Sequence, residues 1–271
     1  MMNLKLKSNN NCLKLVFILI LCIVSFDSKA QQSEFNRKSD SIYFAGPTLF
    51  DCHIQFPTNY SPLKSYPLVI GLHGGGGSYK TFRNIWLRFE NPQFLLATPQ
   101  APYKWLMGDD IGYDWSAWPT GNITFMAEAL NLTSKYIESL INSLSENYNI
   151  EKAYLLGFSQ GSIIAQIAGI HNHDLLRGII IFSGPEINHP GRPEIVWPSA
   201  EAISSANNLE VIIAHGRNDS IVDIELAYKS KKIYEKYGFE VSMFEFEGGH
   251  EIDEGVLKRV EKKINRRKTQ E

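Results

Sequence analysis

The segment AYLLGFSQGSIIAQIAGIH, residues 153–171, decides how this chain folds. Residues 153–156 form a short apolar run, which is typical of a buried β-strand. Residues 159–171 continue as a largely apolar stretch that predicts an α-helix. Between the two lies Gly157-Phe158-Ser159-Gln160-Gly161, so the chain must turn sharply from a strand into a helix at Ser159.

Strands and helices alternate along the rest of the chain. We expect strands at 66–72, 94–98, 176–182, 209–214 and 240–246, and helices at 122–147, 224–237 and 254–267. Residues 66–72 (YPLVIGL) are continuously apolar, as a strand covered on both faces should be. Two short apolar runs within residues 41–57 predict an N-terminal β-hairpin. The alternation therefore predicts an α/β fold with a mostly parallel central sheet and helices on both faces.

Two long connections interrupt this alternation. Residues 99–121 contain three of the five tryptophans, and residues 184–207 contain four prolines and Trp197. Long irregular connections in a compact domain are usually functional. Ligands bind beyond the C-terminal strand ends of parallel sheets, where both connections should emerge. We expect Tyr113, Trp115, Trp118 and Trp197 to line a substrate pocket there, although the tryptophans could instead hold the loops onto the domain.

Ser159 is the candidate nucleophile. The pattern Gly-x-Ser-x-Gly alone is a weak signal, but here it follows an apolar strand and opens a helix. In that context the Oγ of Ser159 projects at the helix N-terminus, where the helix dipole favours developing negative charge. The alternative is a tight turn whose serine only caps the helix.

A serine hydroxyl needs a base that takes its proton and a carboxylate that orients the base. His250 lies just after the predicted strand 240–246, in Gly248-Gly249-His250-Glu251. Asp219 lies just after strand 209–214, with Asp223 as the alternative acid. Both candidates follow strand ends, as Ser159 does. We therefore assign Ser159, Asp219 and His250 as the catalytic residues.

Four consecutive glycines follow strand 66–72 in His73-Gly74-Gly75-Gly76-Gly77. Glycines let a backbone approach a substrate closely. An oxyanion that forms during acyl transfer needs backbone N–H donors. We expect these donors to be Gly75 and Gln160, with Gly74 or Gly76 as substitutes for Gly75. A phosphate-binding loop is excluded because no Gly-Lys-Ser/Thr follows the glycines.

The composition agrees with a folded enzyme and excludes several other classes. The 271 residues are 44% hydrophobic and 21% charged, unlike a disordered, collagen-like or coiled-coil chain. A formal net charge of −2 gives no sign of a nucleic-acid binder. His171 and His173 resemble a metal pair, but their neighbours suggest an ordinary helix end. We expect no metal and no other cofactor.

Residues 1–30 are typical of a secretory signal peptide, with lysines followed by an apolar run over 15–26 and small residues before Gln31. An uncleaved anchor or a lipoprotein modified at Cys22 are the alternatives. Cleavage leaves residues 31–271 as one domain with 23 basic and 28 acidic side chains, net −5. Cys52 then remains alone, and its strand-like surroundings suggest a small core residue. We expect a secreted or periplasmic protein without stable membrane insertion, of undetermined oligomeric state.

Taken together, these residues resemble the α/β-hydrolase superfamily, and within it the phospholipase/carboxylesterase branch. The matching stretches are LHGGGG (72–77), GFSQG (157–161), HGRNDSIV (215–222) and GGHEI (248–252). Ser162 departs from the resemblance, because the branch often has glycine there. The chain order Ser159, Asp219, His250 is also that of α/β-hydrolases.

The resemblance implies a serine esterase that cleaves a small-molecule or glycan-linked carboxylic ester through an acyl-enzyme. It does not specify the acyl group or the alcohol. A serine peptidase of the same fold is one alternative, because the same residues can cleave amides. A non-catalytic binding protein is the other.

Overall fold

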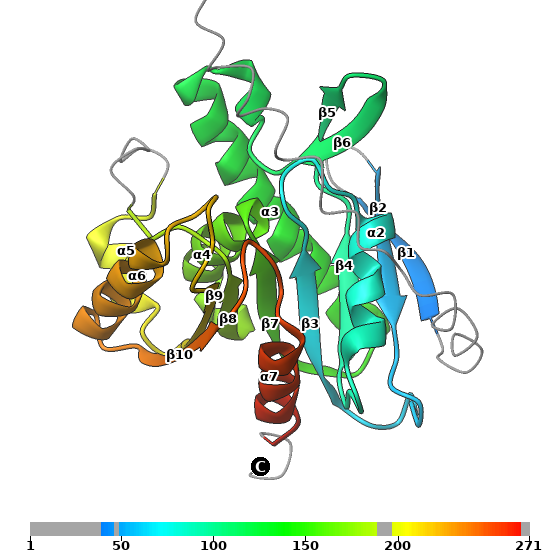
Figure 1. The fold of residues 1–271 in the computed structure, drawn as a ribbon. Helices are drawn as coiled ribbons and strands as arrows, with labels where there is room; N and C mark the ends of the chain where they lie inside the picture. Colours follow the sequence, from blue (N-terminus) through cyan, green and yellow to red (C-terminus); the bar gives the residue numbers. More distant parts are fainter. Residues whose placement is uncertain (1–38, 46–48, 189–196, 267–271) are drawn as a thin grey trace, which may run out of the picture. The chain divides into compact units, whose positions relative to one another are not determined.

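An eight-stranded sheet carries the fold in the computed structural model, which describes residues 39–45, 49–188 and 197–266 (Figure 1). These residues belong to one compact unit. The strands, in spatial order, are β1 (Ser39–Ala45), β2 (Leu49–Gln55), β4 (Leu95–Pro99), β3 (Tyr66–Leu72), β7 (Ile150–Phe158), β8 (Leu176–Phe182), β9 (Glu210–Gly216) and β10 (Glu240–Phe246). Strand β2 is antiparallel to both β1 and β4, and the remaining neighbours are parallel. The predicted α/β fold and its N-terminal hairpin are confirmed.

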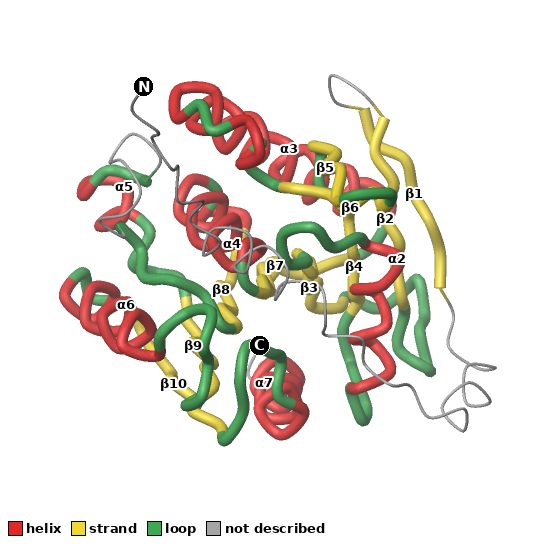
Figure 2. Tube along the Cα trace, turned by 45° about the horizontal axis from the view of Figure 1, so that its top comes forward, coloured by secondary structure: helices red, strands yellow, loops and turns green. Residues whose placement is uncertain are grey.

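Helices cover both faces of the sheet (Figure 2). One face carries α3 (Ile123–Asn147), α4 (Gln160–His171), α5 (Ala200–Ser205) and α6 (Ile224–Lys236). The other face carries α7 (Glu254–Arg266) and a short segment made of α2 (Tyr79–Phe82) and the 3₁₀ helix η3 (Arg83–Arg88). Short 3₁₀ turns lie at Trp118–Thr120 and His173–Leu175.

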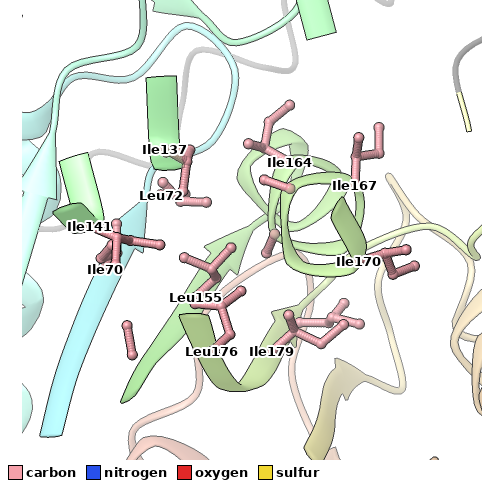
Figure 3. Close-up of a cluster of buried hydrophobic side chains, with 14 of the residues drawn as sticks. Ile70, Leu72, Ile137, Ile141, Leu155, Ile164, Ile167, Ile170, Leu176 and Ile179 are labelled. Atoms are coloured by element: carbon pink, nitrogen blue, oxygen red, sulfur yellow. The ribbon is translucent and has the colours of Figure 1, made fainter. Parts of the chain in front are cut away.

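The central strands are buried on both sides, and their side chains alternate between two apolar clusters. Leu155 and Ile179 pack with α3 and α4 in one cluster, whereas Leu156 and Ile180 pack with α7 in the other. Figure 3 shows the first cluster, in which Leu155 and Ile179 of the sheet face helix residues such as Ile167. This period of two is why the middle of each of these strands is continuously apolar.

The connection that we expected to be irregular contains a second sheet. Strands β5 (Tyr103–Met107) and β6 (Asp110–Asp114) form an antiparallel hairpin within residues 99–121. Gly108 has a φ of 67° in the two-residue turn. Lys104 and Leu106 are exposed whereas Trp105 and Met107 are half-buried, so the strand alternates with period two. In the other long connection α5 is short, and residues 189–196 lie outside the described residues.

Candidate active site

Ser159 lies at the sharp turn between β7 and α4, as the sequence predicted. Its φ of 53° and ψ of −118° form a backbone conformation that residues other than glycine rarely adopt. The turn is tight because both flanking glycines touch backbone. A Cβ on Gly157 would overlap the carbonyl oxygen of Gly161, and one on Gly161 would overlap that of Leu72. The Gly-x-Ser-x-Gly pattern thus has a steric reason in this fold.

His250 joins Ser159 to Asp219. Its Nε2 lies 2.9 Å from the Oγ of Ser159, and its Nδ1 lies 2.8 Å from the Oδ2 of Asp219. An ionised carboxylate only accepts hydrogen bonds, so Nδ1 carries the proton and Nε2 is free to accept one. The three residues come from the ends of β7, β9 and β10, which lie apart in sequence. Asp223 instead caps the N-terminus of α6, where it accepts from the N–H of Glu225 at 3.0 Å.

Asp219 is held as a carboxylate by four hydrogen-bond donors. Its Oδ1 accepts from the N–H groups of Ile221 and Val222, both at 2.9 Å. Its Oδ2 faces His250 and also lies 3.3 Å from Nε2 of His215. Burial alone raises the pKa of Asp219, but the bonds from His215, His250 and the two backbone groups hold it well below its ordinary value.

His215 is a contact of the acid that sequence analysis did not anticipate. Its ring is fully buried, and its Nε2 donates to the carbonyl of Val222 at 2.7 Å while facing Asp219. The His-Gly pair that opens HGRND is the signal that could have revealed it. The bond from His215 to Val222 lies within the loop that follows β9.

His73 anchors the glycine loop. Its Nδ1 donates to the carbonyl of Gly74 at 2.8 Å, and its Nε2 accepts from the N–H of Ala101 at 3.4 Å. Burial lowers the pKa of His73 to about 4, against the opposing effects of the Gly74 bond and the Asp114 charge. The ring is therefore neutral at physiological pH.

The glycine loop lies beside the nucleophile. A Cβ on Gly74 would be 3.6 Å from Cβ of Ser159, and one on Gly75 would be 3.2 Å from the side-chain oxygen of Gln160. The N–H of Gly76 donates to the carbonyl of Tyr113 at 2.9 Å. Gly76 is therefore already committed, which leaves Gly75 and Gly74 as the loop's candidate oxyanion donors.

Comparison with known proteins identifies the family. Residues 59–267 match the model of the phospholipase/carboxylesterase family, which is most of the chain. The chain belongs to this family. It is a hydrolase of the carboxylesterase and phospholipase type, and the resemblance inferred from its motifs is confirmed. Among the curated proteins compared by sequence, none matches.

Solved structures that resemble this family member include esterases. A ferulic acid esterase from Anaeromyces mucronatus is 17% identical with a TM-score of 0.60, covering 86% of this chain and 93% of its own. A carboxylesterase from Bacillus cereus is 16% identical with a TM-score of 0.58, covering 89% and 99%. One of two fungal esterases from Rhizomucor miehei is 10% identical with a TM-score of 0.68, covering 97% of both chains. At these identities the likeness shows the fold.

The four aromatic residues predicted for the pocket lie in different environments. Trp115 is fully buried and its Nε1 donates to the carbonyl of His73 at 2.8 Å, so it lies beneath the site rather than on its surface. Trp197 is 7% exposed and belongs to the core. Trp118 is 48% exposed, and Tyr113 is half-buried. Only Trp118 and Tyr113 are thus open to a substrate in this arrangement.

Two remaining expectations concern metals and membranes. Within residues 39–45, 49–188 and 197–266, no three or more His, Cys, Asp or Glu side chains gather as metal ligands. The same described ranges contain no helix with the length and apolar character to cross a bilayer.

Cys52 is a buried free cysteine, as expected of a small core residue. The predicted signal peptide lies outside the described residues.

Proposed function

We propose that this hydrolase cleaves carboxylic esters with Ser159 as nucleophile, His250 as general base and Asp219 as the orienting acid. The observation that carries the proposal is the position of His250, which is within hydrogen-bond distance of both Ser159 and Asp219. A nucleophile, a base and an orienting group in that order are what serine-based acyl transfer requires.

In the first half-reaction, Oγ of Ser159 attacks the ester carbonyl carbon while Nε2 of His250 takes the hydroxyl proton. The imidazolium that forms is stabilised by Asp219, whose low pKa keeps it ionised throughout. The tetrahedral intermediate then collapses, the bond to the alcohol oxygen breaks, and His250 returns its proton to the leaving alcohol. The acyl group remains on Ser159 as an ester.

The oxyanion of that intermediate needs two donors. The N–H of Gln160 is the first of α4, a 12-residue helix whose N-terminus favours negative charge. We assign the second donor to Gly75, with Gly74 as the alternative, because Gly76 is committed to Tyr113. No hydrogen bond from the N–H of Gly75 to the described part of the chain competes with the oxyanion.

Water completes the cycle. With the alcohol gone, Nε2 of His250 takes a proton from water, and the resulting hydroxide attacks the acyl carbon. The second intermediate collapses, the bond from the acyl carbon to Oγ of Ser159 breaks, and His250 returns its proton to Oγ as the carboxylic acid leaves. This chemistry requires no metal and no organic cofactor.

The substrate class that we propose is a small-molecule or glycan-linked ester. A ferulic acid esterase whose structure holds ferulic acid, an aromatic acid, is among the structural neighbours. Trp118 offers a half-exposed aromatic surface suited to stacking such a ring. Screening acetyl-sugar, lysophospholipid, feruloyl and simple aryl esters would identify the preferred group.

Ser159→Ala tests the proposal. The variant should stay folded, lose hydrolysis of a short-chain p-nitrophenyl ester, and lose labelling by a fluorophosphonate. Ser205→Ala is the matched control, because that serine is exposed on α5 and should leave both readouts unchanged. Retained turnover in Ser159→Ala would refute the assignment, and faster turnover of matched amides by the wild type would favour a peptidase.

Export of the protein is also part of the proposal and rests on residues 1–30 alone. Expression in a bacterial host followed by N-terminal sequencing of the exported fraction should give a chain that begins at Gln31. A chain that retains Met1 in the membrane fraction would instead indicate an anchor, and lipid on Cys22 would indicate a lipoprotein.

A further inference from the structure

Asp114 is a buried charge that the proposed mechanism does not use. It is the last residue of β6 and is 0% exposed. Its Oδ1 accepts from the backbone N–H groups of Ser116 at 2.8 Å and of Trp118 at 3.0 Å. Its Oδ2 accepts from Nε2 of Gln160 at 2.5 Å. A buried carboxylate is costly unless donors surround it, so its arrangement suggests a specific task.

Gln160 connects this carboxylate to the nucleophile. The residue follows Ser159 directly and supplies the proposed oxyanion donor through its backbone. Its side chain points to β6, where Nε2 donates to Asp114 and Oε1 accepts from the N–H of Trp115 at 3.2 Å. Both polar ends of the amide are therefore fixed by adjacent residues of the hairpin strand.

The same end of β6 also holds the glycine loop. The backbone carbonyl of Tyr113 accepts from the N–H of Gly76 at 2.9 Å, and the backbone N–H of Tyr113 donates to the carbonyl of Gly77 at 3.1 Å. The indole of Trp115 donates to the carbonyl of His73 at 2.8 Å. Gly75 thus lies in a loop whose two sides are both bonded to residues adjacent to Asp114.

We propose that Asp114 is a positioning residue that sets the oxyanion hole, acting through the Gln160 side chain and the end of β6. The inference rests on the proposed function, because it assigns the oxyanion donors to Gln160 and Gly75. Its physical basis is that the carboxylate bonds the Gln160 side chain and also the backbone at the end of β6, whose residues Tyr113 and Trp115 hold the glycine loop. A displacement of about 1 Å at such donors costs on the order of 10²-fold in rate.

Asp114→Asn is the direct test. The asparagine amide must turn N–H donors either toward Nε2 of Gln160 or toward the N–H groups of Ser116 and Trp118, so donors oppose donors in both orientations. We expect kcat for a p-nitrophenyl ester to fall about 10- to 100-fold while KM changes less than threefold. Affinity for an arylboronic acid, whose tetrahedral adduct on Ser159 uses the oxyanion hole, should fall by a similar factor.

A double variant supplies a rescue that a general loss of structure would not show. In Asp114→Asn with Gln160→Glu, the asparagine N–H can donate to the glutamate, while Trp115 still donates to it. This double variant should recover at least about tenfold in kcat over Asp114→Asn alone. Asp110→Asn is the control, because it removes the same charge from an exposed position of the same strand. Its kcat should stay within twofold of wild type.

Gln160→Met covers the case in which Asp114→Asn does not fold. It keeps the backbone donor and the carboxylate but removes their link, so kcat and boronic acid affinity should both fall at least fivefold. A purely structural role for Asp114 would lower the melting temperature and leave kcat and boronic acid affinity unchanged, which would overturn the inference. If wild type itself neither turns over esters nor reacts with a fluorophosphonate, the proposed function fails instead.

Discussion

Replacing Asp219 by asparagine tests the orientation of the base most sharply. Asp219 accepts two backbone N–H groups on Oδ1, which an asparagine Oδ1 can still accept. The new N–H₂ group then occupies the place of Oδ2, 2.8 Å from Nδ1 of His250. Since that group only donates, Nδ1 must become an acceptor and the ring proton must move to Nε2. His250 then presents a proton to Ser159 instead of accepting one.

The opposite orientation of the asparagine is no better. Turning its N–H₂ toward Ile221 and Val222 sets donors against two backbone donors, at about 1–3 kcal/mol for each unsatisfied group. In other Ser-His-Asp enzymes, the wrong ring tautomer lowers kcat about 10⁴-fold. At about 1.36 kcal/mol per tenfold, this is about 5.5 kcal/mol of lost transition-state stabilisation. We expect a loss of this order in Asp219→Asn.

The assay is steady-state hydrolysis of a p-nitrophenyl ester, with thermal melting to verify that the variant is folded. The matched control is Asp223→Asn, which removes the same charge four residues away and keeps a good helix cap. It should retain kcat within about threefold. A folded Asp219→Asn with kcat within tenfold of wild type would refute the orientation argument, and a larger loss in Asp223→Asn would make that residue the acid.

Three further predictions follow from the packing and protonation of the site. Burial keeps His73 neutral with a pKa of about 4 against an ordinary 6.5, so between pH 6.5 and pH 4 only the unfolded chain binds this proton. The free energy of unfolding, measured with urea, should therefore fall by about 3 kcal/mol as the pH is lowered through that window. In His73→Gln this part of the pH dependence should be absent. Gly157→Ala places a methyl group against the carbonyl of Gly161. The free energy of unfolding should therefore fall by about 1–3 kcal/mol, and fluorophosphonate labelling should slow. An unchanged melting temperature would contradict the steric argument. Trp118→Ala removes a 48% exposed ring. If the ring contacts substrate, KM for aryl esters should rise several-fold while kcat and the melting temperature stay constant. If the ratio of the KM values for aryl and acetyl esters is the same in the variant as in wild type, that contact is excluded.

The parallel strands and their strand-end residues could be predicted because their causes are local. A strand covered on both faces is mostly apolar: β3 is apolar throughout, and β9 is apolar over residues 211–214. The glycines around Ser159 also follow from one local event, the turn from β7 into α4. Ser159 and His250 could therefore be placed at one edge of the sheet from sequence alone.

The sequence favoured Asp219 as the acid but left Asp223 open as an alternative. Both residues follow β9, and they differ in their position relative to α6. Asp223 caps the N-terminus of α6, whereas Asp219 lies in the loop before it. The β5–β6 hairpin was missed for a related reason. Its exposed Leu106 and Ile111 are apolar register partners, so the usual alternation of apolar and polar residues is blurred.

Long-range polar contacts were beyond sequence reasoning altogether. Gln160 and Asp114 are 46 residues apart, and nothing in either segment identifies the other as its partner. Asp114 sits between aromatic residues in a stretch where a solvated aspartate would look the same. Only the fold brings the start of α4 against the end of β6, and with it the support for the proposed oxyanion donors.

The strained backbone of Ser159 shows how the fold holds its nucleophile. A non-glycine residue at φ 53° and ψ −118° costs about 1–3 kcal/mol. The N–H of Ser159 donates to Phe182 at 3.0 Å, and its carbonyl accepts from the N–H of Ser162 at 3.0 Å and from the Ser162 hydroxyl at 2.6 Å. At about 1 kcal/mol each, these bonds offset the strain. Ser162, where the family often has glycine, therefore contributes a bond that glycine cannot make, and the strain at Ser159 is balanced by its immediate neighbours on β8 and α4.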